Sequence, residues 1–202
     1  MVDNPRGVFV AVDGPKHAGK TTVLDLLIPM LTASGLGVLR TKEPTAAFDL
    51  SQEQSRAGAA LARLLAEDRA RHLRETIRPG LRRYDVVITD RFIASSLVFQ
   101  VLDGVPIDQV WAMNRDVLLP DLNIFLTTGP TSIHRRQAAR GVLTRFKRDQ
   151  RTEEEISQYA TAREVMTEHG VLTIELMNDD DMRPIDTAAA MVAHILGRVG
   201  RR

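Results

Sequence analysis

The sequence predicts an α/β fold in which a five-stranded parallel sheet is covered by helices on both faces. Short apolar runs of strand length alternate along the chain with stretches of helical pattern. That alternation is typical of parallel strands joined by crossover helices. The first run, residues 8–12, is hydrophobic throughout rather than at every second position, as a strand buried on both faces should be.

Five segments have the length and composition of strands. Each is short and mostly apolar, with β-branched residues prominent. The predicted strands are residues 8–12, 38–40, 86–88, 122–126 and 171–176.

Helical patterns occupy the stretches between these strands. A helix is predicted from about Lys20 until residues 35–37, which read Gly-Leu-Gly. A long helix rich in alanine, leucine and arginine is predicted over 55–79, with Pro79-Gly80 as its boundary. Further helices are predicted over 92–102 and 107–118, into 135–141, from 152 onwards and over 185–196.

The composition is that of a single domain. The chain has 202 residues, of which 44% are hydrophobic, enough for one sizeable core. Neither an internal repeat nor a low-complexity linker is visible. Residues 1–202 are therefore predicted to form one domain, with the basic segment at about 135–151 as a short lid.

Charge and residue content exclude several classes of protein. The 27 basic and 26 acidic groups leave a formal charge of +1, which gives no global sign of nucleic-acid binding. The chain has no cysteine, so disulfides, thiolate chemistry and cysteine-based zinc sites are absent. The N-terminus lacks a signal-peptide pattern, and no segment reaches the roughly 20 apolar residues that cross a bilayer. We expect a cytoplasmic protein that binds neither nucleic acid nor membrane.

Residues 14–21 read GPKHAGKT and match the phosphate-binding pattern G-x-x-x-x-G-K-[ST]. A predicted buried strand precedes them and a helix follows, which is the context of a P-loop. The glycines let backbone N–H groups point at phosphate oxygens, and the helix adds the positive end of its dipole. Lys20 is expected to reach the β- and γ-phosphates, and the Thr21 hydroxyl to bind Mg²⁺. The residues expected to bind ATP are Gly14, Pro15, Lys16, His17, Ala18, Gly19, Lys20, Thr21 and Thr22.

The end of the third predicted strand narrows the class of P-loop protein. Its sequence is Asp90-Arg91 rather than Asp-Glu, so the water-activating glutamate of many ATPases is missing. No N/T-K-x-D motif for reading guanine is present, which speaks against a regulatory GTPase. Arg91 stands where α/β sheets place their ligands, and an arginine there suits a second phosphate group. These features favour a small-molecule kinase.

Several motifs, in order and spacing, resemble those of the thymidylate kinase family. The P-loop follows an acidic residue and glycine, and TKEP at 41–44 resembles T-R-E-P. LLAEDR at 64–69 resembles L-L-F-x-x-x-R, and DRF at 90–92, followed by Ser95-Ser96 and Gln100, resembles D-R-Y/F with S-S-x-x-Y-Q. A weaker match joins 140–146 to the lid pattern R-G-x-x-D-R.

The resemblance implies a doubly wound P-loop fold, Mg-ATP as donor, dTMP as acceptor, a place in nucleotide biosynthesis and a homodimer. It also implies site residues. The catalytic residues would be Lys20, Arg91, Arg145 and Asp13, with Arg140 as a further ATP contact. The metal-binding residues would be Thr21, Asp90 and Asp13. The acceptor-binding residues would be Glu43, Pro44, Leu65, Arg69, Arg91, Phe92, Ser96, Phe99 and Gln100.

Five positions depart from the family pattern. Leu65 replaces a phenylalanine that stacks on thymine, Lys16 replaces a carboxylate that meets the sugar 3′-hydroxyl, and His17 replaces a loop arginine. In the lid, Thr144 and Lys147 replace an aspartate and a glutamate. The departures at 65 and 16 lead to the hypothesis that dTMP binds more loosely than in typical relatives and that more acceptors are tolerated.

Two alternatives to a dTMP kinase stay open at this point. One is a kinase of the same fold that acts on a modified nucleotide, a nucleoside or another small acceptor. The other is a nucleotide-binding protein without catalytic activity, although Lys20, Thr21 and Asp90 favour an active enzyme. A screen of acceptors with Mg-ATP would separate these possibilities.

Overall fold

The protein contains one five-stranded parallel sheet, as the computed structural model of residues 7–140 and 152–200 shows. The strand order is β2-β3-β1-β4-β5. The strands are β1 (Val8–Asp13), β2 (Val38–Lys42), β3 (Val86–Asp90), β4 (Leu122–Thr127) and β5 (Thr173–Met177). All five predicted strands are present. The three central strands are almost entirely buried, which explains why their sequences are apolar without alternation.

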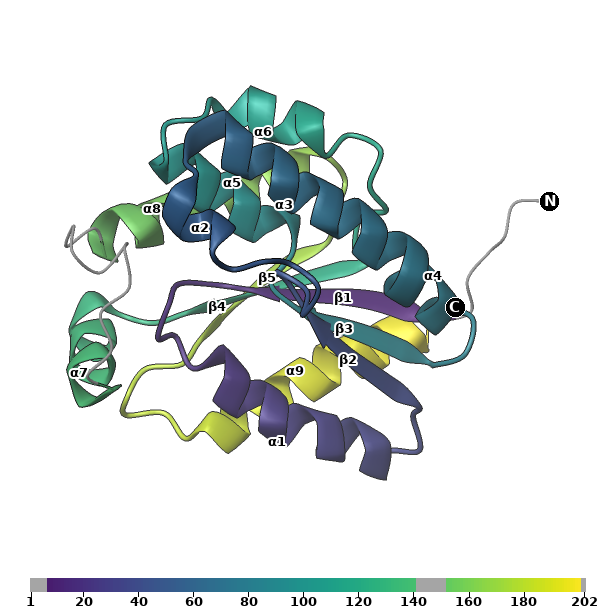
Figure 1. The fold of residues 1–202 in the computed structure, drawn as a ribbon. Coiled ribbons are helices and arrows are strands. Elements are labelled where there is room, and N and C mark those ends of the chain that lie inside the picture. The colour runs from purple at the N-terminus through teal and green to yellow at the C-terminus, as the bar shows by residue number, and fades with distance from the viewer. Residues whose placement is uncertain (1–6, 141–151, 201–202) are drawn as a thin grey trace.

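Helices cover both faces of the sheet (Figure 1). One face carries α1 (Lys20–Ala33) and α9 (Pro184–Val199), which pack against each other over one apolar cluster. The other face carries α3 (Gly58–His72), α5 (Ile93–Leu102) and α8 (Thr152–Glu168), over a second cluster. The doubly wound arrangement expected from the sequence is confirmed.

The register of the sheet brings the ends of its central strands together. Val12 in β1 is paired with Asp90 in β3, and Asp13 with Phe125 in β4. The loops that follow β1 and β3 therefore leave the same carboxyl edge. Ligands of open α/β sheets bind at this edge, where the chain crosses to opposite faces.

The long helix predicted over 55–79 is divided in the structure. A short helix α2 (Gln52–Ser55) is separated from α3 by Arg56 and Ala57, which are extended. After α3 the chain forms a π-helical turn (Leu73–Ile77) and then α4 (Arg78–Leu81). Pro79 has no N–H to donate back along a regular α-helix, and the wider turn lies just before it. The Gly58 backbone is left-handed, with φ +57°, at the new helix start.

The helix predicted over 107–118 is shorter than expected. It forms α6 (Ile107–Met113) and stops at Asn114. The side chain of Asn114 is buried, where its Nδ2 donates to the carbonyl of Val110 and its Oδ1 accepts from Arg69. The helix pattern of residues 107–118 could not predict this contact, because Arg69 is 45 positions away in the sequence.

The predicted lid is described only in part. Its first residues belong to α7 (Pro130–Arg140), which lies at the carboxyl edge of the sheet (Figure 1). Residues 141–151 lie outside the described residues. None of the described helices is long and apolar enough to cross a membrane.

Candidate active site

The P-loop connects β1 to α1 and depends on glycine at two positions. Gly14 has φ +149°, and a Cβ atom there would lie 2.1 Å from the carbonyl oxygen of Leu126 in β4. Gly19 has φ +90°, and its Cβ would lie 2.5 Å from Nδ2 of Asn178. The loop is thus wrapped tightly against β4 and Asn178, and the positive φ at both positions disfavours any residue with a side chain.

Lys20, the first residue of α1, is buried and turns back over the P-loop. Its Nζ donates hydrogen bonds of 2.8 Å to the carbonyl oxygens of Gly14 and Pro15. Burial, with the neighbouring charge of Arg91, lowers the pKa of Lys20 to about 7, although carboxylates led by Asp90 oppose the shift. An anion bound between the two cations would relieve their repulsion, as a phosphate group would.

Asp13, predicted to act near Mg²⁺, is fully buried and accepts hydrogen bonds from three residues. Its Oδ1 accepts from the backbone N–H groups of Phe92 and Ser95 and from the Ser95 hydroxyl, at 2.6 to 3.1 Å. Its Oδ2 accepts from Nδ2 of Asn123 at 3.0 Å. Asp13 therefore holds the amino end of α5 against the sheet. Its part in metal binding and catalysis stays a prediction.

Arg91 has a left-handed backbone, with φ +70°, which is uncommon for a residue with a side chain. Two contacts hold it there. Its N–H donates to the carbonyl of Val12, and its own carbonyl accepts from the Thr89 hydroxyl. Such conformations persist where the surroundings impose them, often at functional sites.

The guanidinium of Arg91 is held by several groups around the site. Its Nη1 donates to the hydroxyl of Tyr159 at 2.8 Å, to Ser95 Oγ at 3.2 Å and to the Gly14 carbonyl at 3.4 Å. It also lies 5.0 Å from the ring centroid of Phe99. Burial raises the pKa of Tyr159 far above its usual value, so this phenol stays neutral. Arg91 is thereby positioned before any phosphate binds.

A second contact from α8 reaches the P-loop itself. Oε1 of Glu155 accepts a 2.8 Å hydrogen bond from the backbone N–H of Lys16. The Lys16 ammonium lies 5.2 Å from the ring of Phe99, on the acceptor side of the loop. The amino end of α8, which follows the predicted lid, is therefore attached to the phosphate-binding loop.

Helix α7 also touches the P-loop. Arg136 donates from Nη1 to the carbonyl of His17 and from Nη2 to the carbonyl of Asn178. Asn178 in turn donates to the carbonyl of Ala18 at 2.8 Å. Arg136 lies within the predicted basic lid, yet it was not among the predicted site residues. Arg136 bonds to the P-loop and to the residue after β5, and contacts of this kind leave no pattern in the local sequence.

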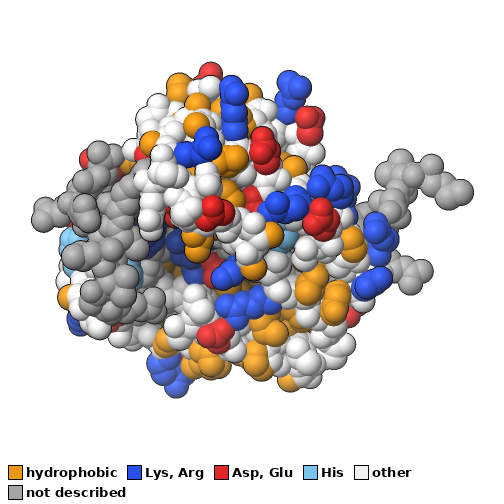
Figure 2. All heavy atoms as spheres, in the orientation of Figure 1, with side chains coloured by type: hydrophobic (Ala, Val, Ile, Leu, Met, Phe, Trp, Pro, Cys, Tyr) orange, Lys and Arg blue, Asp and Glu red, His pale blue; other side chains and the backbone are white. Residues whose placement is uncertain are grey.

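A pocket opens beside the P-loop, between the sheet and the helices α2, α3 and α5. All nine residues predicted to bind the acceptor line it, although they come from three separate motifs. The lining residues are Lys16, Glu43, Pro44, Glu53, Leu61, Leu65, Asp68, Arg69, Arg91, Phe92, Ser95, Ser96, Phe99, Gln100 and Asp103. Figure 2 shows basic side chains in the hollow between the upper helices and the layer below.

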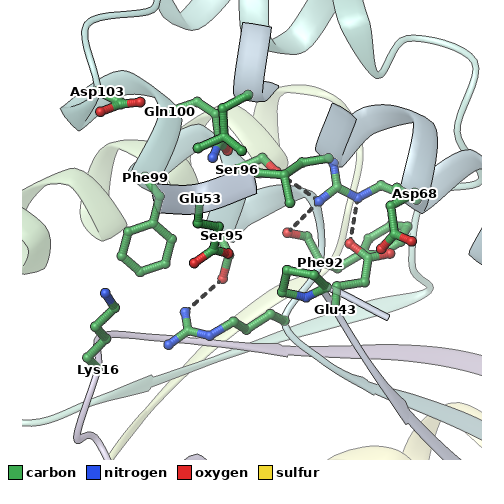
Figure 3. Close-up of a pocket in the computed structure, with 15 residues that line it drawn as sticks. Lys16, Glu43, Glu53, Asp68, Phe92, Ser95, Ser96, Phe99, Gln100 and Asp103 are labelled. Carbon is green, nitrogen blue, oxygen red and sulfur yellow. Dashed lines mark hydrogen bonds and ion pairs between the residues drawn. The ribbon is translucent and has the colours of Figure 1, made fainter. Parts of the chain in front are cut away.

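The pocket has distinct ends. Lys16 lies at one end, Gln100 and Asp103 at the other, and Phe99 and Ser95 between them (Figure 3). The first end adjoins the P-loop and carries cations, whereas the second is bounded by amide and carboxylate groups. Oε1 of Gln100 is buried and accepts no hydrogen bond from the described part of the chain.

Arg69 forms the centre of a buried network in the pocket wall. Its Nε donates to Glu43 at 2.8 Å, its Nη1 to Asn114 at 2.6 Å and its Nη2 to Ser96 at 2.8 Å. The other oxygen of Glu43 lies 3.0 Å from Nδ1 of His72. Most donors of this guanidinium are thus already engaged, and its predicted contact with the acceptor phosphate stays a prediction.

Several residues of the site were not predicted from the sequence. Tyr159, Glu155 and Asn114 contact predicted site residues from elements that carry no recognised motif. Glu53 and Asp103 also line the pocket without belonging to a motif. Asp68 and Ser95 line the pocket as well, and their positions next to Arg69 and Ser96 in the sequence could have indicated this.

Two of the predicted metal ligands lie at the carboxyl edge of the sheet, and their binding of Mg²⁺ stays a prediction. Asp90 ends β3 beside β1, and Thr21 is exposed in the first turn of α1. No three carboxylate or histidine side chains in the described ranges gather into a metal site. A hydroxyl and a carboxylate fit Mg²⁺, which commonly binds through one or two protein oxygens, phosphates and water.

The remaining predicted site residues lie in α1, in α7 or outside the described residues. Thr22 is exposed in the first turn of α1, next to Thr21. Arg140 is the last residue of α7. Arg145, Thr144 and Lys147 lie outside the described residues.

Comparisons with known proteins agree with the motifs. A sequence model of the thymidylate kinase family matches residues 12–178. A thymidylate kinase of Xanthomonas oryzae pv. oryzae (strain PXO99A) is 36% identical over 143 residues, which are 68% of this chain and 63% of the relative. A thymidylate kinase of Bacillus velezensis (strain DSM 23117 / BGSC 10A6 / LMG 26770 / FZB42) is 34% identical over 138 residues, 61% of this chain and 65% of the relative. The matched region thus spans just under two thirds of each relative.

Proposed function

Because the chain belongs to the thymidylate kinase family, we propose that it transfers the γ-phosphoryl group of ATP to a nucleoside monophosphate, and that this acceptor is dTMP. The observation that carries the proposal is the pocket beside the P-loop. It gathers all nine residues expected to bind the acceptor, with Arg91 at its boundary with the loop.

The geometry suits an in-line transfer between two phosphates. A phosphate oxygen of the acceptor would attack the γ-phosphorus, the bond to the bridging oxygen would break, and ADP would leave. Lys20 and Arg91 both donate a hydrogen bond to the Gly14 carbonyl, so the two cations lie close together beside the P-loop. Fixed cations at this place would offset the charge that spreads over the phosphoryl oxygens.

Mg²⁺ is part of the proposal as the ion that accompanies ATP. Thr21 and Asp90 are the residues of this chain that would hold it, since they offer oxygen ligands at the phosphate edge. When bound, the ion would neutralise phosphate charge and orient the donor. The arginine that would close from the lid, Arg145 or Arg140, belongs to the same proposal.

The far end of the pocket supports a pyrimidine with an imide edge. The amide of Gln100 can donate through Nε2 and accept through Oε1, and its buried Oε1 makes no hydrogen bond within the described ranges. Thymine presents an N–H donor beside a carbonyl acceptor, so the two edges are complementary. A nucleotide with this base would therefore form hydrogen bonds with both the nitrogen and the oxygen of the Gln100 amide.

A coupled assay of ADP release tests the proposal. Mg-ATP is supplied with dTMP, dUMP, dCMP, dAMP, dGMP or thymidine, and turnover is expected with monophosphates, dTMP being among the best. Turnover with thymidine alone, or with none of the monophosphates, would contradict it. Tight ATP binding without ADP release would identify a nucleotide-binding protein instead.

We also propose a homodimer and a cytoplasmic location, which family membership and composition support. Light scattering of the purified protein would test the dimer, for which a mass of about twice the 22.5 kDa chain is expected. Fractionation of cells that produce the native protein would test its location.

A further inference from the structure

Glu53 is a carboxylate of the pocket that no sequence motif identifies. It lies in the short helix α2, is half-buried, and lines the pocket. In the close-up, its carboxylate projects into the middle of the pocket, between Phe99 and Phe92 (Figure 3). It therefore lies between the end with the cations and the end with Gln100.

The other pocket carboxylates already have partners. Glu43 is bound by Arg69 and His72. Asp68 accepts from the N–H and hydroxyl of Thr45 and from Arg71. Asp103 accepts from the backbone N–H of Gly58 at 2.6 Å.

Glu53 differs from these three carboxylates. Within the described ranges its side chain forms neither a hydrogen bond nor an ion pair. A half-buried carboxylate in this position can accept hydrogen bonds from a bound ligand without giving up an existing contact.

The chemistry of the acceptor decides which of its groups Glu53 can meet. The phosphate is anionic and belongs with Arg91 and Lys16 at the other end. The base of dTMP has one N–H donor, and Oε1 of Gln100 can accept a hydrogen bond from it. The remaining donor is the 3′-hydroxyl of the sugar, which lies between phosphate and base. Lys16 is a cation and cannot accept a hydrogen bond from it.

We propose that Glu53 accepts a hydrogen bond from the 3′-hydroxyl of the acceptor nucleotide and makes the pocket selective for acceptors that carry it. The inference rests on the proposed function, since it names a contact of the same acceptor. Glu53 is in this sense a specificity-determining residue, contributed by α2 rather than by the P-loop.

Binding measurements test this contact without requiring turnover. Calorimetry compares dTMP with its 3′-deoxy analogue on the wild-type protein, Glu53→Ala and Glu53→Gln. The wild type should bind dTMP about tenfold or more tightly than the analogue, because a hydrogen bond to a charged group is lost. Glu53→Ala should bind both equally, and Glu53→Gln should fall between. Gln54→Ala, an exposed neighbour in the same helix, should keep the wild-type ratio.

Several results would overturn the contact. A wild-type ratio near one would do so, as would an unchanged ratio in Glu53→Ala. If Glu53→Ala changes the affinity for dTMP and for the 3′-deoxy analogue by the same factor, Glu53 acts only through its charge. If it changes the ratio of the affinities for dTMP and dCMP, Glu53 lies at the base. The ADP-release assay separates this from the proposed function. If the enzyme turns over but shows no preference for the 3′-hydroxyl, only the Glu53 contact is rejected. If it shows the preference but no turnover, only the kinase activity is rejected.

Discussion

Nη1 of Arg91 donates a 2.8 Å hydrogen bond to the hydroxyl of Tyr159, although the two residues are 68 positions apart. The same hydroxyl lies 3.0 Å from Ser95 Oγ, which donates to the buried carboxylate of Asp13. A chain of hydrogen bonds thus links the arginine at the phosphate end to the sheet. Arg91 owes its position to α8 as much as to its own strand.

Tyr159→Phe removes one hydroxyl from this chain and leaves the ring in place. We expect kcat/KM for dTMP to fall about tenfold, since a lost hydrogen bond to a charged group costs roughly 1.5–3 kcal/mol and the other contacts of Arg91 remain. Steady-state kinetics would measure it. Tyr84→Phe, on the exposed surface, is the matched control and should keep the wild-type rate. Unchanged kinetics in Tyr159→Phe would show that Arg91 needs no support from α8.

Lys20→Ala should lower kcat by about a hundredfold or more while the fold is retained. Lys20 would contact charge that grows on the transferred group, so its loss should appear in kcat rather than in KM alone. Lys20→Met keeps the apolar stem and serves as a second variant if the alanine form is unstable. Circular dichroism checks the fold of both. A near-normal kcat in a folded variant would exclude the P-loop from the chemistry.

Leu65→Phe should lower the KM for dTMP by about fivefold and narrow the range of acceptors. Leu65 lines the pocket, and base stacking on an aromatic ring is worth roughly 1–3 kcal/mol. Leu65→Met has similar volume without a ring and should leave the KM unchanged. If the phenylalanine variant matches the wild type in both properties, or if the wild type already accepts only dTMP, residue 65 does not contact the base.

Asp179 should make stability depend on pH. It accepts from the Thr128 hydroxyl at 2.6 Å and the Gly129 N–H at 2.8 Å, and these bonds lower its pKa below the ordinary value of about 3.8. A lowered folded-state pKa stabilises the protein above the ordinary pKa, and this contribution is lost as the pH falls through the folded value.

Urea unfolding of the wild type and Asp179→Asn would measure this contribution. The wild type should be more stable at pH 7 and pH 5, and the difference should shrink towards pH 3. Asp116→Asn, at a position that is 92% exposed, should show no such difference. A gap between wild type and Asp179→Asn that stays constant down to pH 3 would contradict the assignment.

The sequence by itself determined the layers of the fold and the residues of the phosphate loop. Apolar runs of strand length require burial on both faces, and Gly14 and Gly19 are the residues that a tight wrap permits. Because motifs follow strand ends, and parallel strands end at one edge, Arg91 and Gln100 could be assigned to one pocket before its shape was known.

Only the tertiary structure decided which side chains complete the site. Tyr159 and Glu155 act through α8, Glu53 through α2, and Asn114 ends its helix to meet Arg69. Their local patterns are those of ordinary helices, because periodicity records which face is buried and not what lies across the interface. Contacts between segments distant in the chain depend on how the helices pack on the sheet, and this packing gives each of these polar residues its partner or its place in the pocket.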